Sequence, residues 1–143
     1  MAITVFLIED HQLLRETWVS FLEQETDIEL TGHSCSGQKA LDMVKERLPD
    51  IVLLDIRMEP WNGLAALEAL QQLKAGLKVI ALSLYVQTEY LKKMLNMGAM
   101  GYLTKNCSIT ELVHAIKEVS SGNKYLTDDV KKCIAGEGDS FAI

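Results

Sequence analysis

The stretch Ile51-Val52-Leu53-Leu54-Asp55 is a run of four apolar residues that leads directly into a carboxylate. The same arrangement occurs near the start of the chain, where residues 3–8 (ITVFLI) lead into Glu9-Asp10. It occurs again where residues 79–82 (VIAL) lead into Ser83. Short and almost wholly apolar runs are typical of central strands in a parallel sheet, because helices bury both faces of such strands. The pattern predicts strands at residues 3–8, 51–55 and 79–83.

Two weaker patterns complete the predicted sheet. Residues 28–34 (IELTGHS) alternate between apolar and polar, which suits an edge strand, and residues 101–104 (GYLT) form a short run before Lys105. Apolar residues with helical spacing separate these runs: Leu14, Trp18, Phe21 and Leu22; Ala40, Leu41, Val44 and Leu48; Leu64, Leu67 and Leu70; Leu91, Met94 and Leu95; Leu112, Ala115, Ile116 and Val119. The alternation predicts an α/β fold, a doubly wound five-stranded parallel sheet with strand order 2-1-3-4-5.

Local signals set the ends of the expected helices. Gly98 is expected to be a left-handed cap, and Ser108 with Glu111 resembles a capping box. We expect residues 1–122 to form one domain, followed by a C-terminal segment at 123–143. In that segment residues 125–134 are predicted to form one more short helix capped by Thr127, and residues 136–140 (GEGDS) are linker-like.

Composition narrows the class of protein. The 143 residues are 48% hydrophobic and 24% charged, as in an ordinary globular domain, and the formal net charge is −6. A negative chain of this kind is not expected to bind nucleic acid or an anionic membrane by itself. The first apolar run is too short for a signal sequence or a membrane span. Three cysteines without metal-ligand spacing suit free thiols in a reducing compartment, so we expect a cytoplasmic protein.

The polar residues at the strand ends should share one crevice. In a doubly wound sheet the carboxyl ends of neighbouring strands converge, so Glu9, Asp10, Asp55, Ser83 and Lys105 are predicted to lie together. Each has an ordinary explanation when taken alone; Asp10, for instance, could cap the first helix. Their joint placement favours a functional site instead.

The charges of these groups predict the chemistry. Three carboxylates in one crevice repel each other unless a cation lies among them, and oxygen ligands on rigid strand ends favour Mg²⁺. We expect Asp10 and Asp55 to bind the ion directly, Glu9 to act mostly through water, and the backbone carbonyl of Arg57 to add a ligand.

An ionised Asp55 beside Mg²⁺ is also a nucleophile for phosphorus, which would form an aspartyl phosphate. The Lys105 ammonium and the Ser83 hydroxyl could stabilise the charge on the transferred group. A carboxylate nucleophile has no proton to lose, so no histidine is required, and His11 is expected to serve only in the cap region of the first helix.

These residues resemble the receiver domain of two-component response regulators, over residues 1 to about 122. Glu9-Asp10 matches the acidic pair of that family, Asp55 the phosphoacceptor, Ser83 the hydroxyl switch residue, Tyr102 the aromatic switch residue and Lys105 the family lysine. Three stretches are similar to the NarL/LuxR-type subfamily in particular: residues 9–15 (EDHQLLR), 82–85 (LSLY) and 98–105 (GAMGYLTK).

The resemblance implies a signalling protein that is not an enzyme in the usual sense but promotes its own aspartyl phosphorylation and dephosphorylation. Its implied partner is a sensor histidine kinase, with a homodimer on phosphorylation. Ser83 would move toward the phosphoryl group and Tyr102 would rotate inward behind it. NarL/LuxR-type regulators continue into a helix-turn-helix domain, so DNA binding is expected only through such a C-terminal domain, absent from these residues.

Two departures from the family pattern stand out. Met58-Glu59 occupies the place of a Met-Pro pair, with Pro60 one position late, and Asn106 follows Lys105 where many receivers have proline. A stand-alone or degenerate receiver that only binds proteins is therefore the alternative reading. A haloacid-dehalogenase-type phosphatase would need an aspartate where Arg57 stands, and the acidic pair Glu9-Asp10 would repel the flavin phosphate of a flavodoxin.

Overall fold

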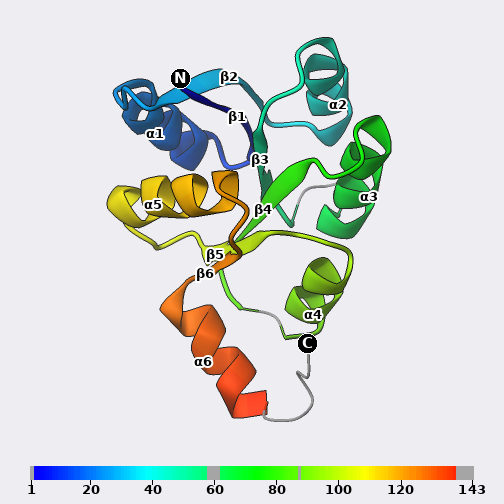
Figure 1. Cartoon of the computed structure of the whole chain (residues 1–143), viewed down its shortest axis with the longest axis vertical. Coiled ribbons are helices and arrows are strands. Elements are labelled where there is room, and N and C mark those ends of the chain that lie inside the picture. The colour runs from blue at the N-terminus through cyan, green and yellow to red at the C-terminus, as the bar shows by residue number, and fades with distance from the viewer. Residues whose placement is uncertain (1, 58–61, 87, 138–143) are drawn as a thin grey trace.

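The computed structural model describes residues 2–57, 62–86 and 88–137. In this part of the chain a parallel sheet of six strands has the order β2-β1-β3-β4-β5-β6 (Figure 1). The strands are β1 (Ile3–Ile8), β2 (Ile28–Ser34), β3 (Ile51–Asp55), β4 (Lys78–Ser83), β5 (Gly101–Thr104) and β6 (Tyr125–Leu126). The first five lie where the sequence predicts them, within one residue at each end, and in the predicted order.

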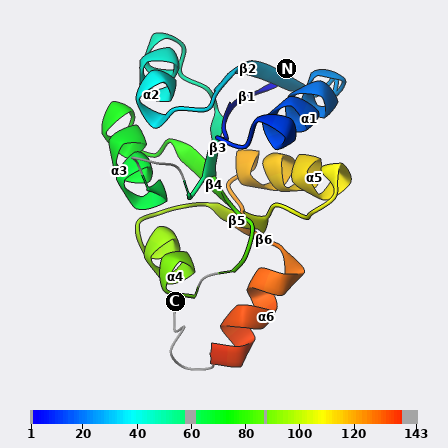
Figure 2. The ribbon, with the colours of Figure 1, turned by 180° about the vertical axis from the view of Figure 1, so that it is seen from behind.

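Helices cover both faces of the sheet. They are α1 (Gln12–Glu23), α2 (Gly37–Glu46), α3 (Gly63–Leu73), α4 (Thr88–Asn96), α5 (Ile109–Ser120) and α6 (Asp128–Glu137). Helices α1 and α5 lie on one face, whereas α2, α3 and α4 lie on the other (Figures 1 and 2). Of the helices in the described residues, none is long and apolar enough to cross a membrane.

The side-chain alternation along each central strand divides the core in two. In β3, Leu53 packs in a cluster with Trp18 of α1 and Ile116 of α5. Leu54 packs on the other side of the sheet in a cluster with Leu67 of α3. Both strand residues are fully buried, so the continuous apolar run in the sequence corresponds to a strand covered on both faces.

Two helix ends agree with the signals in the sequence. Gly98 has a φ of 102°, the left-handed conformation expected after α4. Ser108 caps α5, because its side chain accepts a hydrogen bond from the backbone N–H of Glu111 at 3.0 Å. The Glu111 carboxylate accepts instead from the Tyr125 hydroxyl at 2.9 Å, which ties α5 to β6.

The sixth strand is a correction to the predicted five-stranded sheet. Tyr125 and Leu126 pair in parallel with β5, so the predicted helix over residues 125–134 begins only at Asp128. A strand of two residues has no periodicity that a sequence could reveal, and it forms because β5 offers an unpaired edge. Phe21 and Leu48, predicted on apolar helix faces, are each 44% exposed. Phe21 lies outside the buried stripe of α1, which consists of Trp18 and Leu22, and Leu48 lies beyond the end of α2 at Glu46.

Candidate functional site

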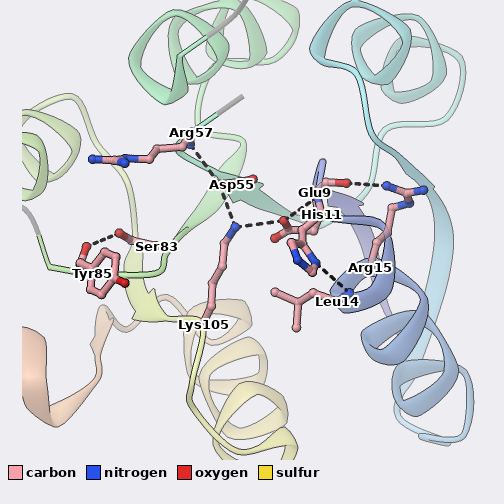
Figure 3. A network of polar contacts seen from close by, with 9 residues as sticks. All are labelled: Glu9, His11, Leu14, Arg15, Asp55, Arg57, Ser83, Tyr85 and Lys105. Carbon is pink, nitrogen blue, oxygen red and sulfur yellow. Dashed lines mark hydrogen bonds and ion pairs between the residues drawn. The ribbon is translucent and has the colours of Figure 1, made fainter. Parts of the chain in front are cut away.

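The strand ends bring the predicted polar residues to one edge of the sheet. Ile8 of β1 pairs with Leu54 of β3. The next residue of each strand, Glu9 and Asp55, therefore lies at the same edge of the sheet. On the other side of β3, Ser83 pairs with Thr104, so Lys105 begins just past the end of β5. Figure 3 shows Lys105 extending from the β5 end into the space between Asp55 and Glu9.

A buried ion triad lies at the centre of this edge. Lys105 Nζ is 2.9 Å from Glu9 Oε2 and 3.1 Å from Asp55 Oδ1. The three side chains are only 6%, 0% and 1% exposed, respectively. Burial of two carboxylates against one ammonium leaves one negative charge in excess, since a single cation cannot neutralise both. The triad is therefore electrostatically incomplete without a further cation.

The oxygens that remain fit such a cation. No hydrogen bond from the described residues reaches Glu9 Oε1 or Asp55 Oδ2, although both atoms are buried. One carboxylate oxygen from each of Glu9, Asp10 and Asp55 can be chosen so that all three lie within 4.8 Å of one another. Buried oxygens without a donor are costly unless a ligand satisfies them, so this acidic cluster could bind a metal ion.

The pKa of the Asp10 carboxyl group is raised in this cluster. Burial raises its pKa above the ordinary value of 3.8, and a hydrogen bond with Asp55 and the negative charge of Asp55 raise it further. The Lys105 ammonium acts in the opposite direction but does not offset these effects. The ionised form of Asp10 is thus disfavoured in a metal-free site, and a bound cation would favour it.

Local hydrogen bonds around β1 leave the Asp10 carboxylate available. His11, not Asp10, caps α1, because its Nδ1 accepts a hydrogen bond from the backbone N–H of Leu14 at 3.3 Å. The simple capping explanation for Asp10 is therefore wrong, and the expectation for His11 is confirmed. Arg15 donates from Nη1 to the Glu9 carbonyl at 2.8 Å, which holds the backbone of the acidic pair.

Arg57 lies beside Asp55 as expected from its place in the sequence. Its backbone N–H donates to Asp55 Oδ1 at 3.0 Å, so it helps to orient the carboxylate that also contacts Lys105. In Figure 3 the Arg57 side chain points away from Asp55. The departure from the family pattern at Met58-Glu59 and Pro60 lies outside the described residues.

A cavity of about 370 Å³ opens above these groups. Its polar wall contains four of the predicted residues, Asp10, Asp55, Arg57 and Lys105. Its remaining wall comes from residues that the sequence analysis did not select: His11, Leu14, Leu84 and Asn106. Leu84 is 61% exposed. Its place on the rim depends on the folded chain, and no pattern in the sequence identifies it.

The two predicted switch residues lie outside the cavity wall. The Ser83 hydroxyl donates to the backbone carbonyl of Tyr85 and so points away from Asp55 (Figure 3). Tyr102 is fully buried in the core cluster on the α4 side of the sheet. The structure therefore brings together Glu9, Asp10, Asp55, Arg57 and Lys105, but holds Ser83 and Tyr102 apart from them.

Several known proteins are similar to this chain in sequence and in fold. The response regulator receiver domain model matches residues 5–117. The transcriptional regulatory protein DesR of Bacillus subtilis is 34% identical over 96% of the chain and 68% of the relative. The transcriptional regulatory protein UhpA of Salmonella typhimurium is 37% identical over 96% of the chain and 69% of the relative. The signal receiver domain of the response regulator NarL from Mycobacterium tuberculosis superposes with a TM-score of 0.79 and 30% identity, over 85% of this chain and 98% of that one.

The fold is that of a receiver-type α/β domain, with an acidic cluster at the carboxyl ends of its strands. The chain belongs to the response regulator receiver domain family, among NarL/LuxR-type regulators. It spans between 52% and 69% of the length of curated relatives such as DegU of Brevibacillus brevis and UhpA.

Proposed function

We propose that the domain accepts a phosphoryl group on Asp55 from a sensor histidine kinase, in a reaction that depends on Mg²⁺. The observation that supports this most directly is the state of the Asp55 carboxylate. One of its oxygens contacts Lys105 and the Arg57 N–H, while the other is buried without a donor from the described residues. A carboxylate that is oriented through one oxygen, has no described donor on the other, and belongs to a residue lining the cavity is suited to attack on phosphorus.

The transfer of the phosphoryl group needs no general base, because the Asp55 carboxylate has no proton to lose. An oxygen of Asp55 donates its electron pair to phosphorus, and the bond from phosphorus to the donor breaks. When the donor is a phosphohistidine, the imidazole nitrogen keeps the electron pair of the broken P–N bond. Lys105 Nζ, 3.1 Å from Asp55 Oδ1, lies where it can pair with an oxygen of the transferred group.

Mg²⁺ would supply a charge that counters the excess carboxylate and orients the phosphoryl oxygens. Asp10 and Asp55 are the residues proposed to hold it directly, Glu9 is proposed to act through water, and the Arg57 carbonyl is proposed as a further ligand. The clustered carboxylate oxygens of the first three residues support this assignment.

Ser83 and Tyr102 are proposed as the switch residues that report phosphorylation. In the structure the Ser83 hydroxyl is hydrogen-bonded to the Tyr85 carbonyl, so it must change partner to reach a phosphoryl oxygen on Asp55. Tyr102 pairs with Ala81, two residues before Ser83 on β4. The Tyr102 side chain is already fully buried, so the response proposed for it is a change of packing within the core and not a move inward from an exposed position.

The wider role follows from the relatives. DesR and UhpA are transcriptional regulatory proteins, so we propose that residues 1–122 form the receiver of a cytoplasmic transcription regulator. Residues 123–143 would connect it to a helix-turn-helix domain that binds DNA, and phosphorylation would favour a homodimer. The alternative of a degenerate receiver that only binds proteins finds no support in the complete set of Asp55, Lys105 and the acidic pair.

Intact mass after incubation with acetyl phosphate and Mg²⁺ tests this function. We expect one phosphoryl adduct on the wild-type protein and none on Asp55→Asn or in EDTA. Asp42→Asn, the same change at an exposed position on α2, is the control and should form the adduct normally. A wild-type protein that binds Mg²⁺ but forms no adduct would overturn the phosphoacceptor assignment in favour of the degenerate receiver.

The lifetime of the adduct is a second measurable property. Arg57 lines the cavity, and Tyr85 is a 72% exposed side chain two residues past Ser83. We propose that these bulky side chains obstruct the path of an attacking water. The double variant Arg57→Ala/Tyr85→Ala is expected to lose the phosphoryl group about threefold faster or more, measured by the decay of the adduct mass. A distant pair with the same chemistry, Arg47→Ala/Phe21→Ala, should leave the decay rate unchanged; equal decay in all three proteins would contradict the idea.

A further inference from the structure

The cation of the site, Lys105, is carried by a tight turn between β5 and α5. The Cys107 backbone N–H donates to the Thr104 carbonyl at 3.1 Å, so the two residues between them form the centre of a β-turn. These two residues are Lys105 and Asn106. The Lys105 N–H donates to the Ser83 carbonyl at 2.7 Å, which ties the start of the turn to β4. The direction of the Lys105 side chain therefore depends on the backbone of this turn.

A side-chain hydrogen bond restrains this turn. Its second central residue is Asn106, which stands where many receivers have proline. A proline ring would restrict the backbone φ angle there, and asparagine does not. In this chain the Thr104 hydroxyl donates to Asn106 Oδ1 at 2.7 Å, a bond that spans Lys105. Thr104 is only 3% exposed, so little water competes for its hydroxyl and the bond can hold the turn.

The same hydroxyl has a second partner in α6. Thr104 hydrogen-bonds with the carboxylate of Asp129, which lies in the first turn of that helix. Burial by itself raises the pKa of Asp129, but hydrogen bonds with the Thr127 and Thr104 hydroxyls and the Val130 N–H outweigh it and hold that pKa below 3.8. The carboxylate is therefore ionised at neutral pH, and a hydrogen bond to an ionised acceptor is about twice as strong as one between neutral groups.

One hydroxyl can serve both partners, although it has a single proton. A hydroxyl accepts as well as donates, and an asparagine side chain turned by 180° presents its NH2 group in place of its oxygen. When Thr104 donates to Asp129, the Asn106 NH2 group can donate to the Thr104 oxygen. The three side chains then remain bonded in sequence, with the strongest acceptor, the ionised carboxylate, at the end.

Helix α6 is itself fixed to the sheet, so Asp129 is a firm anchor. The Thr127 N–H, at the start of the helix, donates to the Tyr102 carbonyl of β5 at 3.3 Å. Thr127 Oγ1 donates to Asp129 Oδ1 at 2.6 Å. The next residue, Val130, is fully buried in the core cluster on the α4 side of the sheet. Figures 1 and 2 both show α6 continuing directly from β6 at this end of the sheet.

The β5–α5 turn lies between the site and α6. Asn106 lines the cavity above Asp55, together with Lys105. It also lines a second cavity of about 300 Å³, whose wall includes Thr104 and Asp129. One side of the turn thus faces the acidic cluster, and the other side faces the first turn of α6.

We propose that Asp129 of α6 is a positioning residue for Lys105 and acts through the buried hydroxyl of Thr104. The inference rests on the proposed function, in which the Lys105 ammonium pairs with an oxygen of the group transferred to Asp55. Asp129 lies beyond residue 122, outside the domain predicted from the sequence. The C-terminal segment therefore contributes to phosphoryl transfer, in addition to any role as a connection.

The rate of adduct formation, followed by intact mass at saturating acetyl phosphate and Mg²⁺, tests this assignment. Asp129→Asn is expected to slow the reaction about fivefold or more, because a small displacement of a reacting group is costly. The Mg²⁺ concentration that gives half the maximal rate should not change, since the proposed metal ligands follow β1 and β3 and not β5. A folding defect is not expected, because Asp129 is exposed.

Asp128→Asn is the matched control. It removes the same charge from an exposed position in the same first turn of α6, so it reproduces any effect on the helix dipole. It should react at the wild-type rate. Equal slowing by the two variants, or a wild-type rate in Asp129→Asn, would overturn the positioning role and leave the proposed function standing. A wild-type protein that forms no adduct would overturn both.

Variants of Thr104 test the path from Asp129 to the turn. Thr104→Val keeps the shape of the side chain but removes the hydroxyl, and should slow the reaction at least as much as Asp129→Asn. Thr104→Ser keeps the hydroxyl and should react at close to the wild-type rate. The double variant Thr104→Val/Asp129→Asn should be no slower than Thr104→Val, because both changes remove the same hydrogen bond. Multiplied effects would contradict the path through Thr104. The comparison of Asp129→Asn with Asp128→Asn decides the positioning role even if Thr104→Val folds poorly.

Discussion

Replacing Lys105 by methionine is expected to lower the free energy of unfolding by about 3–5 kcal/mol in metal-free buffer. The ammonium is the shared partner of Glu9 Oε2 and Asp55 Oδ1, and both carboxylates are almost fully buried. Without it two like charges remain in the interior with no counter-charge, and a buried charge that loses its partner is much more costly than a solvated one. Urea denaturation in EDTA, followed by circular dichroism, measures the loss.

The surface pair Lys117–Asp27 provides a matched control. Its ammonium-to-carboxylate distance of 3.0 Å is like those of the buried triad, but the two side chains are 45% and 65% exposed. Lys117→Met should therefore change the free energy of unfolding by no more than about 1 kcal/mol. Similar losses in the two variants would mean that burial does not set the energy of the Lys105 contacts. Added Mg²⁺ should stabilise Lys105→Met more than it stabilises the wild type, whereas Lys117→Met should gain only as much as the wild type.

Replacing Asp10 by asparagine is expected to raise the melting temperature in EDTA and to shift the stabilisation by Mg²⁺ to concentrations at least about 10-fold higher. A carboxyl group whose pKa is higher in the folded than in the unfolded state binds its proton more tightly when folded. The free energy of unfolding therefore falls as the pH rises from the unfolded value of 3.8 through the raised one, and at pH 7 the loss is complete. Asparagine carries no charge there and avoids this loss.

Although Asp10→Asn should be more stable than the wild type in EDTA, it should gain less stability from added Mg²⁺. Removal of a residue that only orients a metal ligand already lowers metal affinity about 10–100-fold. Removal of a direct ligand should therefore lower the affinity for Mg²⁺ at least as much. Melting temperatures measured over a Mg²⁺ titration report both effects, since a ligand of the folded state stabilises it in proportion to ln(1 + [L]/Kd). Asp42→Asn on α2 is the control and should behave as the wild type. An Asp10→Asn protein that gains as much stability as the wild type at every Mg²⁺ concentration would show that Asp10 is not a ligand of the metal.

Much of the site could be predicted because its residues end strands. The run Ile51–Leu54 determines a strand buried on both faces, and the residue that follows such a strand must emerge at its carboxyl end. The same local reasoning applies to the acidic pair after β1 and to Lys105 after β5. The structure agrees for these residues, which contact or lie near one another across chain separations of up to 96 residues.

Other features could not be predicted, because each depends on which alternative partner a group finds in three dimensions. Either Asp10 or His11 had a side chain able to cap α1, and the choice of His11 leaves Asp10 to the acidic cluster. Ser83 could face Asp55 or the chain that follows it, and the structure has it on the Tyr85 carbonyl. The sequence specifies which side chains can form a hydrogen bond at each position. Which of the possible hydrogen bonds forms depends on the geometry of the folded chain.

The sequence by itself determined the first five strands, the apolar faces of most helices and the carboxylates at the strand ends. Periodicity specifies which side of each element is apolar, and that information is local. Only the tertiary structure decided that β6 pairs with β5 and that Val130 of α6 shares a core with Tyr102. Those contacts depend on which exposed edge and which apolar faces meet after the chain has folded, and no residue pattern within β6 or α6 specifies its partner.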